Sequence, residues 1–161
     1  PQGAVTQYLF NEVAKGTELT FRGAQGVFTL PATLDKELFF ICTGTGIAPF
    51  RSMLQYLRLQ QLAFHKIHLV FGCRFKKDLL YYDEMKELEK LLPGFYYHPT
   101  LSREEWEGHH GYVHPVYENL CKEKPDAQFF LCGWKNMIDE AKKRIIDMGY
   151  DKKSIHQELY G

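Results

Sequence analysis

The stretch that most constrains the fold is residues 38–51, which reads LFFICTGTGIAPFR. Its first five residues form a continuous apolar run, which is typical of a strand buried on both faces of a parallel sheet. Gly44 and Gly46 follow, and a missing side chain lets backbone N–H groups approach a ligand closely. Pro49 suits the first turn of a helix, where its absent N–H has no partner to lose. A strand, a glycine turn and a helix N-terminus together predict an anion site, the usual position of a nucleotide pyrophosphate.

Beyond this stretch, apolar runs alternate with amphipathic helical patterns. The runs at residues 38–42, 67–71, 95–98 and 128–132 predict buried strands, and residues 155–159 predict a short fifth strand. Between them, apolar residues at helical spacing predict four helices with one apolar face each. This alternation predicts an α/β fold, a doubly wound, five-stranded parallel sheet with helices on both faces. The helical stripes span residues 50–57, 81–92, 113–120 and 138–148, with Gly149 after the last as a helix cap.

Ligands of such sheets bind beyond the carboxyl ends of the strands. Four loops follow strands and are therefore predicted to lie along one edge: residues 43–46, 72–74, 100–103 and 132–133. The sequence thus predicts a single crevice built from four loops that are far apart in the chain.

The first 30 residues do not share this alternation. Val5–Val13 predicts a short helix, and Glu18–Arg22 and Val27–Leu30 predict two strands joined by residues 23–26. Two strands and one helix cannot bury a core of their own. We therefore predict that residues 1–33 are the trailing end of a β-domain, and that residues 34–161 form the α/β domain.

Charge and composition limit the possible partners. The chain has 161 residues, a formal net charge of zero and 45% hydrophobic residues. A neutral chain is not expected to bind nucleic acid or an anionic membrane. No apolar run reaches the ~20 residues of a membrane span and no signal peptide is evident, so a cytoplasmic location is expected. The four cysteines have no metal-ligand spacing, which predicts reduced thiols and no metal site.

Several short motifs occur in a characteristic order. They are Gly3–Thr6 (GAVT), Thr43–Phe50 (TGTGIAPF), Asp78–Tyr81 (DLLY) with Asp83 and Glu84, Cys132-Gly133, and Glu158–Tyr160 (ELY). In this combination the chain resembles the ferredoxin–NADP reductase family, flavoenzymes that pair an FAD-binding β-barrel with a pyridine-nucleotide domain. The resemblance implies the C-terminal NAD(P)-binding domain, preceded by a remnant of the FAD barrel. The Arg-x-Tyr-Ser/Thr flavin motif of the family is not in this sequence.

The resemblance also implies an activity and its cofactors. The activity is hydride transfer between NAD(P)H and FAD, with electrons passed to ferredoxin or flavodoxin, and the cofactors are FAD and NADP, with NAD possible. Two other functions stay open. One is a non-catalytic nucleotide-binding module without flavin, and the other is the NADH-dependent reductase component of an oxygenase, which would need an iron–sulfur cluster.

Candidate residues follow from the same resemblance. Cys132 is expected against the nicotinamide, where it helps to place the ring, and Tyr160 is expected to cover the flavin ring, with Glu158 two residues earlier. The nucleotide pyrophosphate loop comprises Thr43, Gly44, Thr45, Gly46 and Pro49, with Gly133 across the crevice. The FAD pyrophosphate element comprises Gly3, Val5 and Thr6, although Thr6 also suits an ordinary helix N-cap.

Ser102 and Arg103 follow the third strand, where the ribose 2′ position should lie. A hydroxyl and a guanidinium suit a 2′-phosphate, which favours NADPH over NADH. Glu104 and Glu105 would repel that phosphate if they pointed inward. A second cation would have to come from Arg74 or a nearby histidine, and Tyr112 is a candidate to stack on the adenine. Trp106 and Trp134 are predicted to be packing residues.

Overall fold

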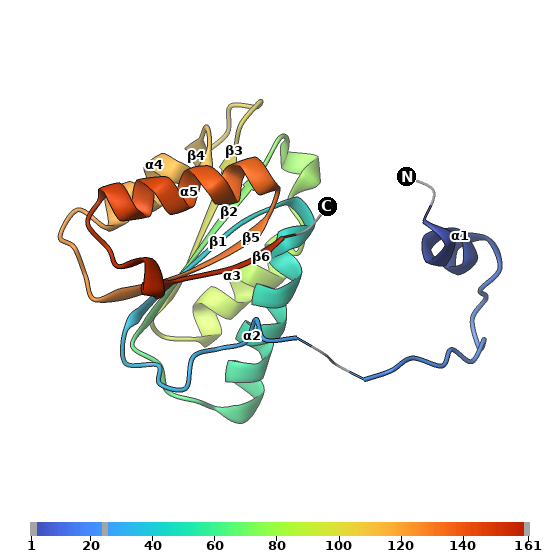
Figure 1. Ribbon diagram of the computed structural model, residues 1–161. Helices are drawn as coiled ribbons and strands as arrows, with labels where there is room; N and C mark the ends of the chain where they lie inside the picture. Colours follow the sequence, from blue (N-terminus) through green and yellow to red (C-terminus); the bar gives the residue numbers. More distant parts are fainter. Residues whose placement is uncertain (1–2, 24–25, 160–161) are drawn as a thin grey trace.

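The computed structural model of the chain describes residues 3–23 and 26–159. Within them lies a six-stranded, all-parallel sheet in the order β4-β3-β2-β1-β5-β6 (Figure 1). The chain builds the sheet outward from the central strand β1 to β4, and then returns to the other side of β1 for β5 and β6. The strands are β1 (Glu37–Thr43), β2 (Lys66–Cys73), β3 (Phe95–Leu101), β4 (His109–His110), β5 (Ala127–Gly133) and β6 (Ile155–Leu159).

Helices cover both faces of this sheet (Figure 1). Helices α2 (Ile47–Gln60) and α3 (Tyr82–Leu91) pack on one face, and α4 (Val113–Leu120) and α5 (Lys135–Asp147) pack on the other. The doubly wound α/β fold predicted from the alternating pattern is confirmed. Three short 3₁₀ turns connect elements: η1 (Gly44–Gly46), η2 (Lys76–Asp78) and η3 (Lys152–Ser154).

Strand β1 shows why its apolar run is continuous. Leu38 and Phe40 face the core under α2 and α3, whereas Phe39 and Ile41 face the core under α4 and α5. All four are at most 1% exposed. Because successive side chains of a strand point to opposite faces, a strand covered on both sides needs an apolar residue at every position.

Two details of the sheet differ from the prediction. The third strand runs on to Leu101, and β4 adds a sixth, two-residue strand at the edge. The side chains of His109 and His110, which form β4, are exposed. A two-residue strand is too short to show a period in sequence, so only its pairing with Thr100 and Leu101 reveals it.

The predicted N-terminal strands are absent. Residues 18–22 and 27–30 are described by the structure and form no strand there. A strand is stable only when a neighbour satisfies its backbone groups, and these segments have no strand partner among the described residues. The predicted helix does form, as α1 (Ala4–Asn11), but none of its residues is buried and it stands apart from the sheet (Figure 1). Phe28 and Leu30 instead pack on the core beside α2.

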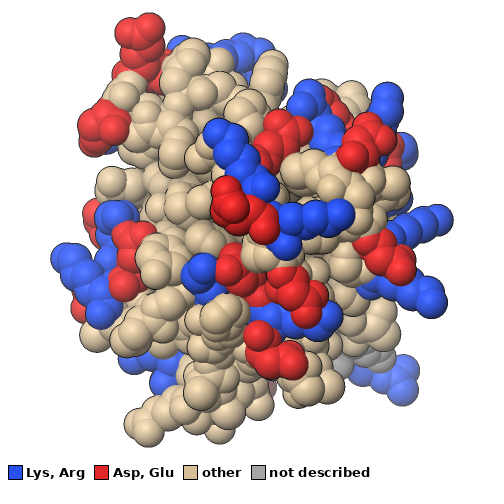
Figure 2. Space-filling view, turned by 90° about the vertical axis from the view of Figure 1, so that its left-hand side faces the viewer, with Lys and Arg blue, Asp and Glu red and all other residues tan. Residues whose placement is uncertain are grey.

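Charges of both signs are interleaved on the face at the amino ends of the strands (Figure 2). Lys66 Nζ lies 2.6 Å from Glu37 Oε1, and Lys36 Nζ lies 2.9 Å from Asp126 Oδ1. This face therefore presents no continuous positive or negative field. No helix in the described part of the chain is both long and apolar enough to cross a membrane.

Two imidazoles lie side by side in the sheet, the buried His68 and the half-buried His98, with His68 Nδ1 3.0 Å from His98 Nε2. Burial, and then the neighbouring His68 and His109, lower the pKa of His98 from 6.5 to about 4. Because the pKa of His98 is lower in the folded chain than in the unfolded chain, the unfolded chain binds more protons between pH 6.5 and 4. The free energy of unfolding therefore has its full value above pH 6.5 and falls as the pH drops from 6.5 toward 4.

We therefore expect the free energy of unfolding to fall by about 1–3 kcal/mol on acidification through that window. The variant His98→Phe should lose less, as measured by urea unfolding at neutral and at acidic pH. His65→Phe, at an exposed position, is the control and should retain the full fall. Equal falls in the two variants would remove this assignment.

Candidate functional site

A cleft of about 870 Å³ lies beyond the carboxyl ends of the central strands. All four predicted loops contribute to its wall. The lining includes Thr43, Gly44 and Thr45 at the end of β1, Gly72, Cys73 and Arg74 at the end of β2, Ser102 and Arg103 after β3, and Gly133 at the end of β5, with Tyr112 before α4. The prediction that these loops share one crevice is confirmed, because parallel strands bring their carboxyl ends to one edge.

The strand order reverses between β1 and β5, and this switch point lies toward one end of the cleft lining. Two glycines allow the backbones to meet there. A Cβ on Gly46 would lie 2.4 Å from the Cys132 carbonyl oxygen, and one on Gly133 would lie 2.6 Å from Thr43 Oγ1. Gly133 also has φ of 134°, which side chains rarely adopt. Both positions therefore require glycine.

The loop between β1 and α2 presents open backbone to the cleft. Gly44 and Thr45 are exposed, and no atom lies within 4 Å of the place where a Gly44 Cβ would be. The 3₁₀ turn η1 leads directly into α2, and the N–H of Ile47, the first residue of α2, donates to the Gly44 carbonyl of that turn. This is the geometry of an anion site at a helix N-terminus.

The ends of β2 and β3 are joined beyond the sheet. The N–H of Ser102 donates to the Cys73 carbonyl at 3.0 Å, and the N–H of Arg103 donates to the Arg74 carbonyl at 3.0 Å. This pairing places two exposed arginines on one wall of the cleft. Neither guanidinium forms an ion pair with any residue that the structure describes.

The Glu104 carboxylate, which could repel an anion bound at this wall, forms a hydrogen bond with the protein backbone. Glu104 Oε2 accepts a hydrogen bond of 2.7 Å from the Lys76 backbone N–H. Glu107 Oε1 lies 3.1 Å from Lys76 Nζ. The acidic residues that line the cleft are Asp78 and Glu140, and Glu140 Oε1 is paired with Arg144 at 2.7 Å. The lining that holds Ser102 and the two arginines therefore also holds the carboxylate of Asp78.

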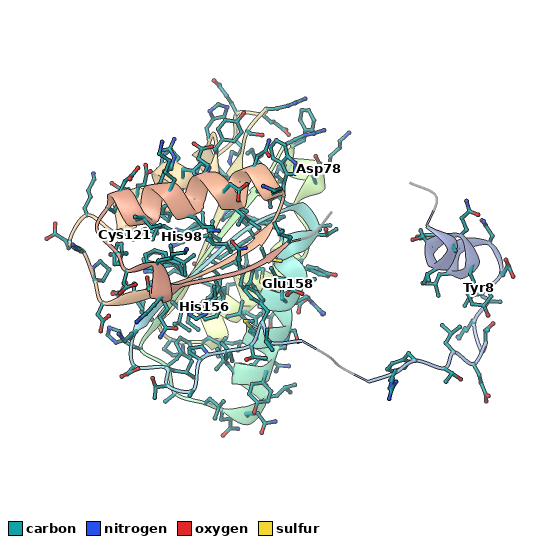
Figure 3. All side chains as sticks on the ribbon, in the orientation of Figure 1. Tyr8, Asp78, His98, Cys121, His156 and Glu158 are labelled. Atoms are coloured by element: carbon teal, nitrogen blue, oxygen red, sulfur yellow. The ribbon has the colours of Figure 1, made fainter. Side chains whose placement is uncertain are left out.

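Cys132 does not reach the cleft wall. Its side chain is 0% exposed and belongs to the core on the α2 side of the sheet. Burial, and then the Glu158 charge, raise the pKa of the Cys132 thiol to about 12, so it stays protonated at neutral pH. Glu158 lies beside Cys132 in the register of β6 with β5. Figure 3 labels Glu158 near the end of β6.

The remaining predicted residues lie in three places. Gly46 and Pro49 stand behind the open loop and do not line the cleft. Gly3, Val5 and Thr6 belong to α1 and its N-cap, on the same helix as Tyr8 in Figure 3, well away from the sheet. Tyr160 lies outside the described residues.

Trp134 was expected to be a packing residue, and the structure corrects this. Its side chain is 64% exposed and lines the cleft, because it follows β5 directly and caps the N-terminus of α5. Its place immediately after Cys132-Gly133 was the signal that could have identified it. Trp106 does pack, against Gly108 and near Tyr82.

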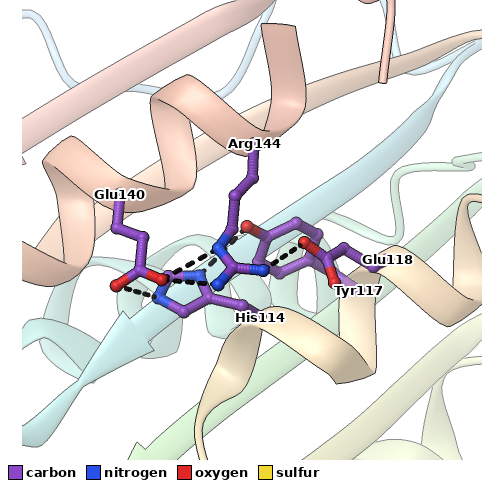
Figure 4. A network of polar contacts seen from close by, with 5 residues as sticks. All are labelled: His114, Tyr117, Glu118, Glu140 and Arg144. Carbon is purple, nitrogen blue, oxygen red and sulfur yellow. Dashed lines mark hydrogen bonds and ion pairs between the residues drawn. The ribbon is translucent and has the colours of Figure 1, made fainter. Parts of the chain in front are cut away.

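A polar network that includes two residues of the cleft lining was not predicted from the sequence (Figure 4). The buried His114 imidazole lies 3.0 Å from the Tyr117 hydroxyl through Nδ1 and 3.4 Å from Glu140 Oε2 through Nε2. Arg144 joins Glu140 to Glu118 at 2.7 and 2.9 Å. Burial lowers the pKa of His114, which keeps this ring neutral at neutral pH. The network ties α4 to α5 beneath the cleft.

Comparison with known proteins agrees with this geometry. The sequence model of the family described as "Oxidoreductase NAD-binding domain" matches residues 40–143, more than half of the chain. The chain is 32% identical to ferredoxin–NADP reductase B of Sorangium cellulosum, and the match covers 98% of this chain and 68% of that protein. It is also 32% identical to one component of the Na⁺-translocating NADH-quinone reductase of Klebsiella pneumoniae, but there the match spans all of this chain and only 41% of that protein.

A solved structure of a ferredoxin–NADP⁺ reductase has a similar fold. The ferredoxin–NADP⁺ reductase of Neisseria gonorrhoeae, determined with bound FAD and NADP, superposes with a TM-score of 0.78 at 25% identity. The superposition covers 99% of this chain and 71% of that one. The parallel sheet, the glycine loop at its switch point and these matches together show that the chain belongs to the ferredoxin–NADP reductase family and carries its oxidoreductase NAD-binding domain.

Proposed function

We propose that this chain binds NADPH in the cleft and presents its nicotinamide for hydride transfer to a flavin, as part of a flavin-dependent NADPH oxidoreductase. The observation that carries the proposal is the pairing of two anion sites in one cleft. One is the open loop of residues 43–46, and the other is the wall of Ser102, Arg103 and Arg74. NADP is a dinucleotide with a pyrophosphate and a separate 2′-phosphate, and it requires two such sites.

The second site supports NADPH over NADH. Two arginines without ion-pair partners among the described residues flank a serine hydroxyl, and guanidinium forks suit phosphate oxygens. Glu104, the acidic residue that follows, is held by the Lys76 backbone. Tyr112, 74% exposed on the same cleft, is proposed to stack on the adenine.

The nicotinamide end is proposed to lie near Cys132, Glu158 and Tyr160. Reduced nicotinamide supplies the hydride, so the contribution of these side chains is distance and orientation. The protonated, buried state of Cys132 fits a placing role and does not fit a nucleophile.

FAD is supported by the family and by the FAD bound in the Neisseria structure. We propose that residues 1–33 belong to the flavin domain, as predicted from the sequence. Among the described residues, α1 offers FAD a helix N-terminus at Gly3–Thr6 but no buried wall beside it. Val5, Phe10 and Phe21 are 71–86% exposed, and such apolar side chains need a covering surface. A complete flavin site therefore needs more walls than these residues offer.

The electron acceptor is proposed to be ferredoxin or flavodoxin, on the strength of the named activity of the Sorangium relative. Its matching length makes that relative the better guide, because the chain covers 68% of it and only 41% of the quinone reductase component.

Titration calorimetry on the chain tests the proposal. NADP⁺ should bind at least about tenfold more tightly than NAD⁺. The reason is that charge-assisted hydrogen bonds to a phosphate add about 1.5–3 kcal/mol to the binding free energy. Equal affinities would remove the 2′-phosphate site, and no binding of either would remove the proposed function. NADPH-dependent dye reduction, measured with FAD and a separately supplied FAD-binding barrel domain of the family, separates a reductase from a binding module, which would bind NADP⁺ and reduce no dye.

A further inference from the structure

The parts of the cleft are arranged in a line along the sheet edge. Arg103 and Tyr112 lie at the β3 end, the loop of residues 43–46 lies at β1, and Trp134 lies at β5. A dinucleotide with its adenosine at β3 and its pyrophosphate at β1 therefore extends its second base toward β5. Trp134 is the aromatic side chain of the cleft lining at that end.

The backbone of Trp134 is held firmly against the pyrophosphate loop. Its N–H donates to Thr43 Oγ1 at 3.3 Å. The preceding Gly133 meets Thr43 so closely that no Cβ would fit between them. The backbone that positions the indole at one end of the cleft is therefore fixed. A fixed backbone reduces the entropy that a binding group loses when it contacts a ligand.

The indole is largely open to solvent. It is 64% exposed, and it forms no ring pair with any aromatic side chain that the structure describes. Trp106, the other tryptophan of the chain, contrasts with it, because its Nε1–H donates to the His109 carbonyl at 2.7 Å and its ring lies 6.3 Å from that of Tyr82. A large aromatic face left open beside a cleft is typical of a binding contact.

We propose that the Trp134 indole stacks on the nicotinamide ring and favours its oxidised state. The oxidised ring carries a positive charge and the reduced ring carries none, and an indole face attracts cations. Trp134 thereby sets the relative affinity of the cleft for NADP⁺ and NADPH. This inference rests on the proposed function, because it needs the dinucleotide to lie in this cleft.

Calorimetry with three ligands tests the inference. Adenosine 2′,5′-bisphosphate occupies only the adenosine half, whereas NADP⁺ and NADPH reach Trp134. The variant Trp134→Leu should weaken NADP⁺ binding by about 5- to 30-fold, weaken NADPH binding less, and leave the bisphosphate unchanged. Trp134→Phe should restore part of the loss, because it retains an aromatic face.

Trp106→Phe is the matched control and should leave the ratio of the NADP⁺ and NADPH affinities unchanged. It also leaves Trp134 as the single tryptophan, so NADP⁺ should quench its fluorescence and the bisphosphate should not. An unchanged NADP⁺ affinity in Trp134→Leu, or an equal loss for NADP⁺ and NADPH, would overturn the inference while the proposed function stands. A wild-type chain that binds none of the three ligands would overturn both.

Discussion

Replacing Arg103 with alanine is expected to weaken NADPH binding by about 10- to 100-fold and to leave NADH binding nearly unchanged. The guanidinium has no ion-pair partner among the described residues, so its removal leaves no protein carboxylate uncompensated. Only the 2′-phosphate, which NADH lacks, would lose a charge-assisted partner. Calorimetry with both nucleotides measures the two affinities directly.

Arg58→Ala is the control for loss of one positive charge. Arg58 is exposed near the end of α2, far along the helix from the cleft loop, and its Nε–H donates to Gln55 Oε1 at 2.9 Å. It should change neither affinity by more than about twofold, because exposed charges at a distance are screened by salt. If Arg103→Ala weakened NADPH and NADH equally, Arg103 would bind a group common to both nucleotides, and the assignment of the 2′-phosphate would be wrong.

Gly46→Ala is expected to destabilise the fold by about 1–3 kcal/mol and to abolish measurable nucleotide binding. The backbone of Gly46, with φ of −61° and ψ of −7°, is one that alanine adopts freely. Conformational preference alone would therefore make the change neutral or stabilising. The added Cβ, however, would lie 2.4 Å from the Cys132 carbonyl oxygen and 2.8 Å from the Gly133 nitrogen.

Those atoms belong to the backbone of β5 and cannot rotate away, so the loop itself must shift. Urea unfolding gives the stability, and calorimetry with NADP⁺ gives the binding. Gly23→Ala is the matched control, because no atom lies within 4 Å of its added Cβ, and its free energy of unfolding should change by less than about 0.5 kcal/mol. A Gly46→Ala variant as stable as the wild type would show that β1 and β5 do not meet as closely as described.

The sheet was predictable because its signals are local. Local patterns predict the elements: a continuous apolar run predicts β1, glycines at 44 and 46 predict the turn, and an apolar stripe predicts α2. The parallel connections then place the loops at one edge of the sheet. The residues of the cleft wall followed from this rule without any knowledge of side-chain positions. Arg74, Ser102 and Arg103 line the cleft because their strands end there.

The N-terminal segment was less predictable for the opposite reason. Residues 18–22 and 27–30 have the composition of strands, yet strand formation depends on neighbouring strands, and none of the described residues supplies them. Helix α1 forms because helical hydrogen bonds are internal to the segment, although its exposed apolar residues are left without a core.

The sequence by itself determined the α/β architecture, the edge at which the cleft lies and the loops that meet there, since these follow from periodicity, glycine placement and the handedness of parallel connections. Only the tertiary structure decided what each side chain does at that edge. It buried Cys132 on the α2 side, engaged Glu104 with the Lys76 backbone and left Trp134 open to the cleft. The physical reason is that the exposure and the hydrogen-bond partners of a side chain depend on residues that are far apart in the chain. No local sequence pattern indicates which of these residues come together.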